Sequence, residues 1–375
     1  MTYRIAALPG DGVGPEVLAE ARRVLDAASA AFGFDIEWSE HLVGGAAIDS
    51  YGVPFRDKDL AACGEVDAIL LGAVGGPKWD DPNASVRPEQ ALFTLRGGLG
   101  LFANLRPVTV HPALAASSPL RPELLEGVDL LILRELTGGL YFGARQEAGE
   151  AGGGERSASD TLPYSEREIA RVVRLAFELA RTRRNRVTSV DKANVLATSR
   201  LWRRVATEVA VEFPDAELNH QLVDSCAMLL VKRPAEFDVL VTENLFGDIL
   251  SDEASVLAGS LGLLPSASLG ERRTERGTFG LYEPIHGSAP HLAGQDRANP
   301  IGTILSAAML ARWSLGRADV AVAIEGAVSA ALDAGWRTPD LARESDTTDG
   351  LVVVGTTAFA TAVIERLGVG SGVAA

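Results

Sequence analysis

The chain has 375 residues, of which 47% are hydrophobic and 23% charged, and this composition is typical of a globular protein large enough for two lobes. Its formal net charge of −15 argues against a nucleic acid or an anionic membrane as a partner, because acidic surfaces repel phosphate. The two cysteines, Cys63 and Cys226, cannot form a disulfide framework, and we expect both to be buried thiols.

The N-terminal sequence MTYRIAALPGDG has neither the basic region nor the long apolar stretch of a signal peptide. No apolar run along the chain reaches the length that spans a membrane. We therefore expect a cytoplasmic protein that does not cross a membrane.

Short β-branched or Leu-rich runs alternate with helical patterns along most of the chain. Strands are predicted at 3–8, 67–72, 130–136, 186–190 and 237–242. Helices are predicted where apolar residues recur at spacings of three and four, at 15–31, 165–182, 198–213 and 299–315. This alternation predicts an α/β architecture with much parallel strand pairing.

Two segments have unusual composition. The segment 144–163 (ARQEAGEAGGGERSASDTLP) is too polar for a core and too rich in glycine for a helix, so we predict a loop or a projecting arm. The basic run 181–186 (RTRRNR) follows a predicted helix, whose C-terminus favours cations, and we prefer this interpretation to a nucleic-acid patch.

Three aspartates are candidate metal ligands. Asp248 and Asp252, in NLFGDILSDEAS, are four residues apart, which on a helix places both carboxylates on one face. Their mutual repulsion, roughly a few tenths of a kcal/mol in water, would become binding energy for a divalent cation. A solvated helix face is the alternative. Asp224, in HQLVDSCAML, lies between apolar stretches and could instead be a buried capping residue.

Lys192 and Tyr141 are candidates for proton transfer. Lys192 follows an apolar strand in VTSVDKANVL, where partial burial could make it a base, although an ordinary ion pair with an acid is the alternative. Tyr141 lies in LTGGLYFG, where glycines allow close approach of the backbone, and a core tyrosine is the alternative there.

Three arginines could bind carboxylates through paired hydrogen bonds. Arg134 ends a Leu/Ile run and is hard to bury without an anionic partner. Arg96 and Arg106 come from LRGGLGLFANLRP, and the alternative for both is a pair of surface cations. Arginines, aspartates and a Lys/Tyr pair together supply what a divalent metal and a dicarboxylic hydroxy acid would need.

Three turns rich in Gly and Pro, at 8–16, 71–80 and 284–294, could lay backbone N–H groups against a diphosphate. None has the spacing of a dinucleotide GxGxxG motif or of a P-loop, and ordinary surface turns are the alternative.

At these residues the chain resembles the β-decarboxylating isocitrate/isopropylmalate dehydrogenase family. Eight motifs occur in the family's order between residue 8 and about residue 300, with a weaker likeness in GWRTPDLA beyond them: LPGDGVGPEV, GGPKWD, LFANLRP, RELTGGLYFG, VDKANVL, NLFGDILSD, GSLGLLPSASLG and EPIHGSAP. Eight ordered motifs are a specific signal, whereas no single one of them would be.

The resemblance implies an α/β fold with two lobes, unlike the Rossmann fold, and an active-site cleft between the lobes. One lobe, residues 1–99 with 255–375, would bind the cofactor. The other, residues 100–254, would carry the substrate, metal and dimer contacts, with an intersubunit arm near 140–165. The family's obligate homodimer would place Lys192 and Asp224 in the partner's cleft.

The resemblance also implies the reaction: oxidative decarboxylation of 3-isopropylmalate in leucine biosynthesis, with NAD and with Mg²⁺ or Mn²⁺. The three arginines (Arg96, Arg106 and Arg134) would bind the malate carboxylates, and the three aspartates (Asp224, Asp248 and Asp252) would hold the metal. Lys192 would assist removal of the hydroxyl proton, and Tyr141 would protonate the enolate carbon. The residues expected near NAD lie along 75–89 and 286–299, with Glu283 shortly before the second stretch. They are Gly75, Gly76, Glu89, Glu283, His286, Gly287, Ser288, Ala289, His291 and Asn299.

An alkyl substituent on the substrate is favoured over a third carboxylate by Leu92, Phe93 and Val195. Burying a carboxylate against them would cost several kcal/mol, whereas a branched alkyl group would gain about 1 to 3 kcal/mol. Phe93 and the sequence RGGLG depart from the family's usual residues, so a bulkier 3-substituted malate is an alternative.

The cofactor region also departs from the family. His291 replaces the Asp expected in NAD-preferring relatives, and Asp296 and Arg297 stand where uncharged residues are expected. The Lys–Tyr pair typical of NADP is absent too, since Leu292 follows His291, so NAD is the preferred prediction.

Two other classes of function remain as alternatives. A Mg²⁺-dependent phosphoryl-transfer enzyme would use the acidic pair and the glycine turns, but the chain has no GxxxxGK[ST] motif. A non-catalytic binding protein would give no reason for Lys192 and Tyr141 to accompany a metal site.

Overall fold

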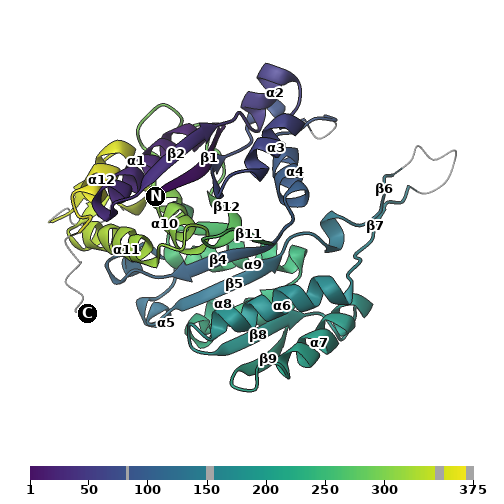
Figure 1. Cartoon of the computed structure of the whole chain (residues 1–375). Coiled ribbons are helices and arrows are strands. Elements are labelled where there is room, and N and C mark those ends of the chain that lie inside the picture. The colour runs from purple at the N-terminus through teal and green to yellow at the C-terminus, as the bar shows by residue number, and fades with distance from the viewer. Residues whose placement is uncertain (82–83, 149–155, 343–349, 369–375) are drawn as a thin grey trace. The chain divides into compact units, whose positions relative to one another are not determined.

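The computed structural model describes residues 1–81, 84–148, 156–342 and 350–368, and these form two compact units (Figure 1). Unit 1 comprises Met1–Leu101, Thr109–Glu123 and Ser255–Ala375, and unit 2 comprises Phe102–Val108 and Leu124–Ala254. Residues 109–123 therefore group with unit 1, whereas we expected them in the middle lobe. Among the described residues, none of the helices combines the length and the apolar composition that spanning a membrane requires.

Unit 1 contains five strands of the large sheet, in the order β2-β1-β3-β12-β11. Its β1, β2, β3 and β12 run parallel, and β11 pairs with β12 in the antiparallel direction. The strands are β1 (Thr2–Gly10), β2 (Asp35–Glu40), β3 (Ala68–Ala73), β11 (Pro265–Arg273) and β12 (Thr278–Pro284). The helices are α1 (Gly14–Phe32), α2 (Gly45–Tyr51), α3 (Asp57–Gly64), α4 (Gln90–Gly98), α10 (Ile301–Trp313), α11 (Ala318–Asp333) and α12 (Thr356–Ile364). Two short strands, β13 (Trp336–Arg337) and β14 (Val352–Val353), pair separately.

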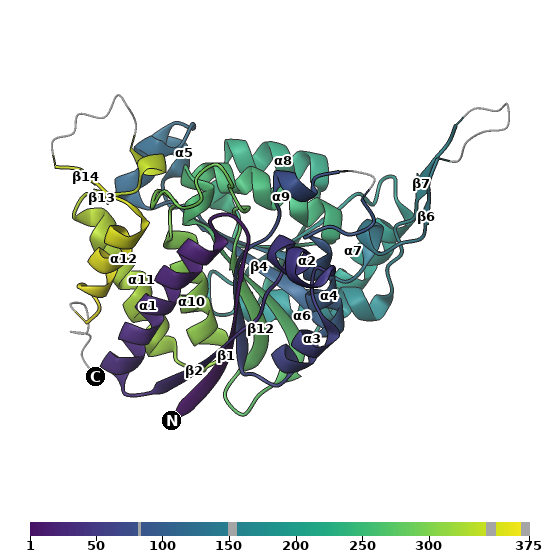
Figure 2. The same cartoon turned by 90° about the horizontal axis from the view of Figure 1, so that it is seen from above.

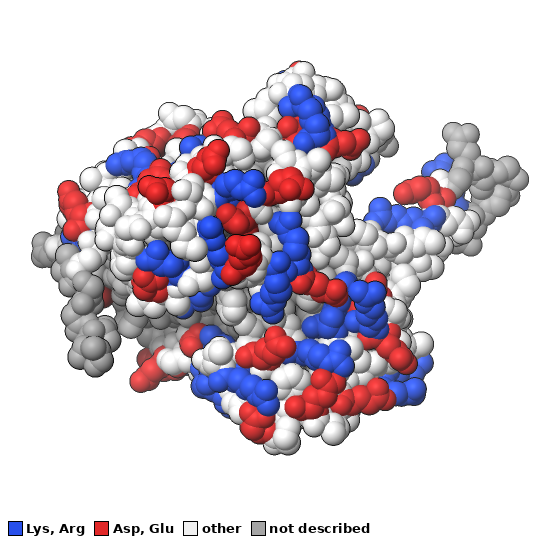
Figure 3. All heavy atoms as spheres, in the orientation of Figure 1, with Lys and Arg blue, Asp and Glu red and all other residues white. Residues whose placement is uncertain are grey.

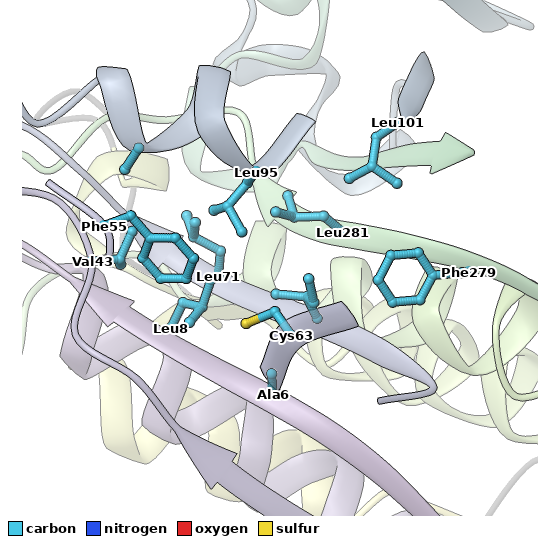
Figure 4. Close-up of a cluster of buried hydrophobic side chains, with 12 residues drawn as sticks. Ala6, Leu8, Val43, Phe55, Cys63, Leu71, Leu95, Leu101, Phe279 and Leu281 are labelled. Carbon is cyan, nitrogen blue, oxygen red and sulfur yellow. The ribbon is translucent and has the colours of Figure 1, made fainter. Parts of the chain in front are cut away.

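The helices α3 and α4 pack against one face of the unit 1 strands through a buried apolar cluster (Figure 4). The strands contribute Leu8, Leu71 and Leu281, and the helices contribute Cys63 and Leu95. The other face is covered by α1 and α10, and α11 and α12 pack against these two helices (Figures 1 and 2). Because both faces are covered, the strands read as continuous apolar runs rather than alternating ones.

Unit 2 contains the strands β4-β5-β10-β8-β9 of the large sheet, in this order, and β5, β10, β8 and β9 run parallel. Helices α6 and α7 cover one face, and α8 and α9 lie on the other (Figures 1 and 2). The strands are β4 (Leu101–Thr109), β5 (Asp129–Glu135), β8 (Arg186–Asp191), β9 (Glu217–Leu222) and β10 (Val239–Thr242). The helices are α6 (Glu166–Ala180), α7 (Ala197–Ala210), α8 (Val223–Lys232) and α9 (Asn244–Ser255), and a short α5 (Pro122–Leu125) spans the unit boundary.

Local sequence signals explain where helices begin and end. At the start of α6, Ser165 and Glu168 form a reciprocal capping box, which satisfies backbone N–H groups that a helix leaves unpaired. The helix α1 has Pro15 in its first turn and ends at Gly33, whose φ of 70° suits glycine. The five predicted strands and four predicted helices are confirmed, with ends shifted by a few residues.

The segment 144–163 contains a narrow hairpin, in which β6 (Arg145–Gln146) pairs antiparallel with β7 (Ser159–Asp160). It projects from the rest of unit 2 in both views (Figures 1 and 2). Its central residues 149–155 lie outside the described residues, and the intersubunit role of this arm stays a prediction.

The basic run 181–186 forms ion pairs with nearby acids. Arg183 contacts Asp129 at 2.9 Å and Asp238 at 2.8 Å, and Arg186 contacts Glu217 at 3.2 Å. Blue and red side chains are interspersed on the face shown in Figure 3, without an extended area of one sign. These arginines are therefore structural cations at the end of a helix rather than a polyanion site.

Candidate active site

A cluster of polar side chains from three elements of unit 2 surrounds the first turns of α9. The Tyr141 hydroxyl donates to Asp248 Oδ2 at 2.8 Å, and Arg134 Nη1 forms an ion pair with Asp248 Oδ1. Arg106 contacts both carboxylates of the helix, Asp248 at 3.8 Å and Asp252 at 3.1 Å. Residues that are up to 146 positions apart in sequence thus converge on one helical face.

The two arginines of this cluster are buried. The side chains of Arg134 and Arg106 are 5% and 11% exposed, so the alternative of a surface cation is wrong for Arg106. Arg106 is held by Asn104, which accepts from its Nε at 2.8 Å, and by Ser251, which accepts from its Nη1 at 2.7 Å. A buried guanidinium needs an anionic partner, and the partner here is a carboxylate of α9.

The Asp248 and Asp252 carboxylates have the chemistry of a hard-cation site. Their side chains are 34% and 67% exposed, so their oxygens remain accessible from solvent. The prediction that both lie on one face of a helix is confirmed, because both contact Arg106. Carboxylate oxygens are ligands that Mg²⁺ and Mn²⁺ prefer, so this donor set fits the expected metal.

Tyr141 is poised as a protonated phenol. Burial, and then the hydrogen bond to Asp248 with its negative charge, raise the pKa of Tyr141 to about 12, against an opposing effect of Arg134. The preceding turn depends on glycine, because a Cβ at Gly139 would lie 2.7 Å from the Tyr164 hydroxyl and its φ is 76°. The expected close approach of two backbone segments is confirmed at Gly143 of the same motif, where a Cβ would lie 1.9 Å from the Thr161 carbonyl oxygen.

Lys192 and Asp224 form an ion pair elsewhere in unit 2. Lys192 Nζ donates to Asp224 Oδ1 at 2.7 Å, and the lysine lowers the pKa of that carboxyl. Asp224 is in the first turn of α8 with a 62% exposed side chain, so a buried capping role is wrong. The adjacent Asp191 is buried and pairs with Arg203 at 2.8 Å instead of with Lys192.

Within one protomer the three aspartates do not form one site. Across 1–81, 84–148, 156–342 and 350–368, no three His, Cys, Asp or Glu side chains lie close enough together to hold a metal ion. Asp224 is engaged by Lys192, whereas Asp248 and Asp252 are engaged by the arginines. The placement of Asp224 in a partner's site, which the resemblance implies, stays a prediction.

The three glycine-rich turns come together in unit 1, so ordinary surface turns are the wrong description of them. The Asp11 carboxylate accepts hydrogen bonds from the backbone N–H groups of Gly45, Ala46 and Gly75, at 2.8, 2.8 and 2.9 Å. The N–H of Val13 donates to the Ser288 carbonyl at 2.8 Å. One buried carboxylate and one backbone bond therefore tie 8–16 to both 71–80 and 284–294.

The expected cofactor residues of these turns leave little room for larger side chains. A Cβ at Gly75 would lie 3.0 Å from Glu89 Oε1, and one at Gly12 would lie 2.0 Å from the Ser288 carbonyl oxygen. Ala289 has a φ of 36°, a strained value for a residue other than glycine. Residues 82–83 of the expected stretch 75–89 lie outside the described residues.

His286, one of the residues expected near NAD, has a buried ring nitrogen to which a cofactor could bond. Its Nδ1 contacts the Gly287 carbonyl oxygen at 2.9 Å, whereas its Nε2 is buried and has no hydrogen-bond partner in the described part of the chain. Burial lowers the pKa of this imidazole, so it is neutral at physiological pH. A ligand group that pairs with Nε2 would remove the cost of this unpaired atom, and the turns therefore fit a dinucleotide.

Arg96 and Glu283 hold each other in unit 1. Arg96 Nη2 donates to Glu283 Oε1 at 2.9 Å, and the two side chains are 13% and 10% exposed. The surface-cation alternative is therefore wrong for Arg96 too. The Arg96 Nε is buried and has no partner among the described residues.

The apolar residues expected near the substrate are partly exposed. On the helix α4 Leu92 packs partly against the apolar cluster, while Phe93 is 43% exposed. In unit 2, Val195 is 63% exposed.

One of the departures from the family in the cofactor region, Asp296, has a structural role. Asp296 accepts from the Thr357 backbone N–H at 2.8 Å and from its hydroxyl at 2.9 Å, and so caps the start of α12. His291 is exposed. Asn299 accepts from the Ile301 N–H at 3.0 Å, so part of its side chain supports the start of α10.

Several residues that organise the site were not singled out from the sequence. They are Asp11, Asn104, Asn244 and Ser251, all of them buried. Asp11 has a usable signal, because an acid between two glycines in PGDG suggests a carboxylate that binds backbone N–H groups. Ser251 and Asn244 give no local signal, since their arginine partners lie 145 and 110 positions away. Asn104 bonds Arg106 two positions along the same strand, and an asparagine in a strand is no signal of that role.

The parallel α/β units and the arginine–carboxylate–tyrosine cluster are features of an enzyme that binds an anionic substrate. Residues 4–363 match the isocitrate/isopropylmalate dehydrogenase family, and the chain belongs to this family of oxidoreductases. This membership removes support for the phosphoryl-transfer and binding-protein alternatives.

Named relatives and solved structures agree with this assignment. The chain is 58% identical over 341 residues, 91% of its length and 95% of the relative's, to a 3-isopropylmalate dehydrogenase from Anaeromyxobacter dehalogenans. It is 57% identical over 341 residues, 91% and 90% of the two lengths, to one from Geobacillus kaustophilus. A solved isocitrate dehydrogenase from Methylococcus capsulatus is 34% identical, with a TM-score of 0.83 over 97% of this chain and 99% of that one.

Proposed function

We propose that this chain catalyses the NAD- and divalent-metal-dependent oxidative decarboxylation of 3-isopropylmalate to 2-oxo-4-methylpentanoate, a step of leucine biosynthesis. The names of relatives such as that from Anaeromyxobacter dehalogenans support the substrate. The observation that carries the chemistry is the convergence of Arg106, Arg134 and Tyr141 on Asp248. The free, buried cysteines are consistent with a reducing cytoplasm as the location.

The arginines would bind and orient the two carboxylates of the substrate. Arg106 and Arg134 are buried and already fixed by neighbours, so they lose little side-chain entropy on binding. Arg96, through its buried Nε without a partner, would contribute a third guanidinium. Charge-assisted, paired hydrogen bonds of this kind select a planar anion.

Lys192 would take the proton of the substrate hydroxyl, and Tyr141 would deliver a proton to carbon after CO₂ leaves. The raised pKa keeps the Tyr141 phenol protonated at neutral pH, as a proton donor requires. Lys192 is held by Asp224, one of the carboxylates proposed to hold the metal.

The residues proposed to hold the metal are Asp248 and Asp252, with Asp224 of a second copy, and those for NAD are the turns at 75–89 and 286–299 with Glu283. When bound, the metal would supply a Lewis acid for charge that develops on oxygen, and NAD would accept a hydride. The contribution of the chain is to orient the diacid with arginines and to place a base and an acid at defined positions.

The apolar residues Leu92, Phe93 and Val195 would contact the alkyl substituent. Each exposes apolar surface, and covering it with a branched alkyl group would gain about 1 to 3 kcal/mol. A carboxylate in their place would lose several kcal/mol of hydration. A larger 3-substituted malate is the second candidate, because Phe93 leaves open how large the substituent is.

The proposed partner is a second copy of the chain. Met228 and Val231 on α8 and Ile249 on α9 are 65%, 44% and 57% exposed, and burying them requires another surface. The two helices are neighbours, since the pKa of Cys226 of α8 is raised by burial and then by the charge of Glu253 of α9. The proposed set of three carboxylates needs the Asp224 of a second protomer, which makes the dimer part of the catalytic proposal.

An assay of reduced nicotinamide by its near-ultraviolet absorbance tests the reaction. Purified protein is offered 3-isopropylmalate, isocitrate, malate or a bulkier 3-alkylmalate, with NAD or NADP, with and without Mg²⁺. We expect 3-isopropylmalate with NAD and metal to be turned over fastest. Equal or faster turnover of isocitrate would remove the argument from the apolar side chains, and faster turnover of the larger malate would favour the second candidate.

Mixing two inactive variants tests the shared site. Lys192→Ala and Asp252→Asn protein are unfolded and refolded together, so that half of the dimers carry one of each. If Lys192 acts in the partner's site, each mixed dimer has one intact site, and the mixture regains about a quarter of wild-type activity. A mixture as inactive as its components would show that Lys192 acts within its own protomer. Refolded wild-type protein is the control for recovery.

A further inference from the structure

Asn244, the first residue of α9, bonds both Arg134 of β5 and the turn that leads to Tyr141. Its side chain is buried, and its Oδ1 accepts from Arg134 Nε at 3.0 Å and from Nη2 at 2.8 Å. Its Nδ2 donates to the carbonyl oxygens of Leu136 and Gly138, at 3.2 and 3.1 Å. Both acceptor sites and both donors of the amide are therefore used.

The turn that Asn244 contacts leads directly to Tyr141. The Tyr164 hydroxyl accepts from the Asn244 backbone N–H at 3.0 Å and donates to Glu135 Oε2 at 3.3 Å. Glu135, which is fully buried, in turn accepts from the N–H of Gly138 at 2.8 Å. Asn244 thus fixes the turn 135–138 by donating to the turn's carbonyl oxygens, and Glu135 fixes it by accepting from the turn's N–H groups.

We infer that Asn244 is a positioning residue that fixes Arg134 and the turn before Tyr141 without adding a second carboxylate to the one, Asp248, that already pairs with Arg134. This inference rests on the proposed function. The side of the guanidinium formed by Nε and Nη2 is the one that would otherwise form a paired bond with a carboxylate. Here a neutral amide oxygen occupies it, which orients the arginine without cancelling its positive charge.

Asparagine is the residue type that meets both requirements. An aspartate could accept from Arg134 in the same way, but its negative charge would neutralise the guanidinium, and it could not donate to the carbonyls of Leu136 and Gly138. An alanine would leave Nε and Nη2 of Arg134 without this acceptor and both carbonyls without this donor, so the arginine could adopt other rotamers.

Kinetics of three variants test this inference. Asn244→Ala and Asn244→Asp change the amide, and Asn185→Asp is the matched control, a change from neutral to charged in unit 2 at a residue that bonds the Asp215 carbonyl. We expect the KM for 3-isopropylmalate to rise about 10-fold in Asn244→Ala and about 100-fold in Asn244→Asp. The KM for NAD should change less than twofold in all three, and the control should match the wild type.

The split between the KM values for 3-isopropylmalate and for NAD gives a readout that a merely structural role would not produce. Misplacement of Arg134 should raise the KM for the diacid alone, because the turns proposed to bind NAD lie in unit 1, whereas Asn244 and Arg134 lie in unit 2. If Asn244→Ala does not fold, this split in Asn244→Asp decides alone.

Two outcomes would overturn the inference. One is a KM for 3-isopropylmalate within twofold of wild type in Asn244→Asp. The other is an equal rise of the KM values for diacid and NAD, since that indicates general loss of structure. Failure of the proposed function is a distinct result, because wild-type protein itself would then fail to oxidise 3-isopropylmalate.

Discussion

Replacement of Tyr141 by phenylalanine separates the proton-donor role from every other role of the cluster. The substitution removes only the hydroxyl that donates to Asp248 at 2.8 Å. A hydrogen bond to a charged acceptor contributes about 1.5–3 kcal/mol when buried. Because this phenol is only partly buried and Asp248 keeps Arg134 and Arg106, we expect a loss of about 1 kcal/mol in the free energy of unfolding.

The kinetic effect of Tyr141→Phe should be much larger than the effect on stability. Loss of a general acid lowers kcat by about 10²- to 10⁴-fold. Because protonation of carbon follows oxidation and decarboxylation, rapid mixing should show a burst of reduced nicotinamide, of one equivalent per active site, before the slow steady state. In Lys192→Ala the burst should be absent, because loss of the hydroxyl proton accompanies oxidation.

The two variants together can refute this order of events. A kcat of Tyr141→Phe within twofold of wild type would exclude Tyr141 as the proton donor. A slow reaction without a burst in Tyr141→Phe would place its role at or before oxidation. A full burst in Lys192→Ala would exclude Lys192 as the base.

The pKa of Tyr141 gives a matching prediction for stability against pH. Folding raises this pKa from 10 to about 12, so the native state favours the neutral phenol. The contribution to stability is therefore complete below about pH 10 and is lost as the pH rises from about 10 to about 12. The difference in unfolding free energy between wild type and Tyr141→Phe, measured with denaturant, should shrink over that interval. A difference that does not change with pH would contradict the raised pKa.

Three further predictions concern the cofactor turns and the metal. Asp11→Asn should raise the KM for NAD about 10-fold and leave the KM for 3-isopropylmalate unchanged, because an amide cannot accept all three backbone N–H bonds. Initial-rate kinetics measure both constants, and an unchanged KM for NAD would contradict this prediction. Asp296→Ala should destabilise the protein by about 1–2 kcal/mol through loss of the α12 cap, seen as a lower Tm, whereas Asp296→Asn, which keeps an acceptor, should be close to wild type. Removal of divalent metal with a chelator should abolish turnover, and Mn²⁺ or Mg²⁺ should restore it; turnover in the metal-free protein would show that Asp248 and Asp252 do not hold an essential ion.

Much of the parallel framework could be predicted because its signals are local. The strands around 67–72 and 237–242 are apolar runs of strand length, and the helix after Ser165 has both a capping box and apolar spacing. The antiparallel pair β11 and β12 was not predicted. Its residues include Pro265 and Gly270, which weaken a strand pattern, and pairing with a distant strand supplies what local preference lacks.

The site was partly predictable for a different reason. Asp248 and Asp252 carry their own geometry, since a spacing of four on a helix fixes them on one face. The burial of Arg106 could not be read from its neighbours, because Ser251 and Asp252 lie 145 and 146 positions away. The same holds for Asn244, whose contact with Arg134 spans 110 positions. Such contacts exist only once the sheet has brought its strand ends together.

The Asp11 carboxylate has a practical consequence for changing the cofactor preference of this enzyme. It bonds to backbone groups 34 and 64 positions along the chain, so the conformation of the turn at Gly75 depends on the position of the start of α2. A library that varies these segments separately would mostly sample broken arrangements. Exposed positions such as His291, which carry no comparable constraint, offer the safer starting point for redesign.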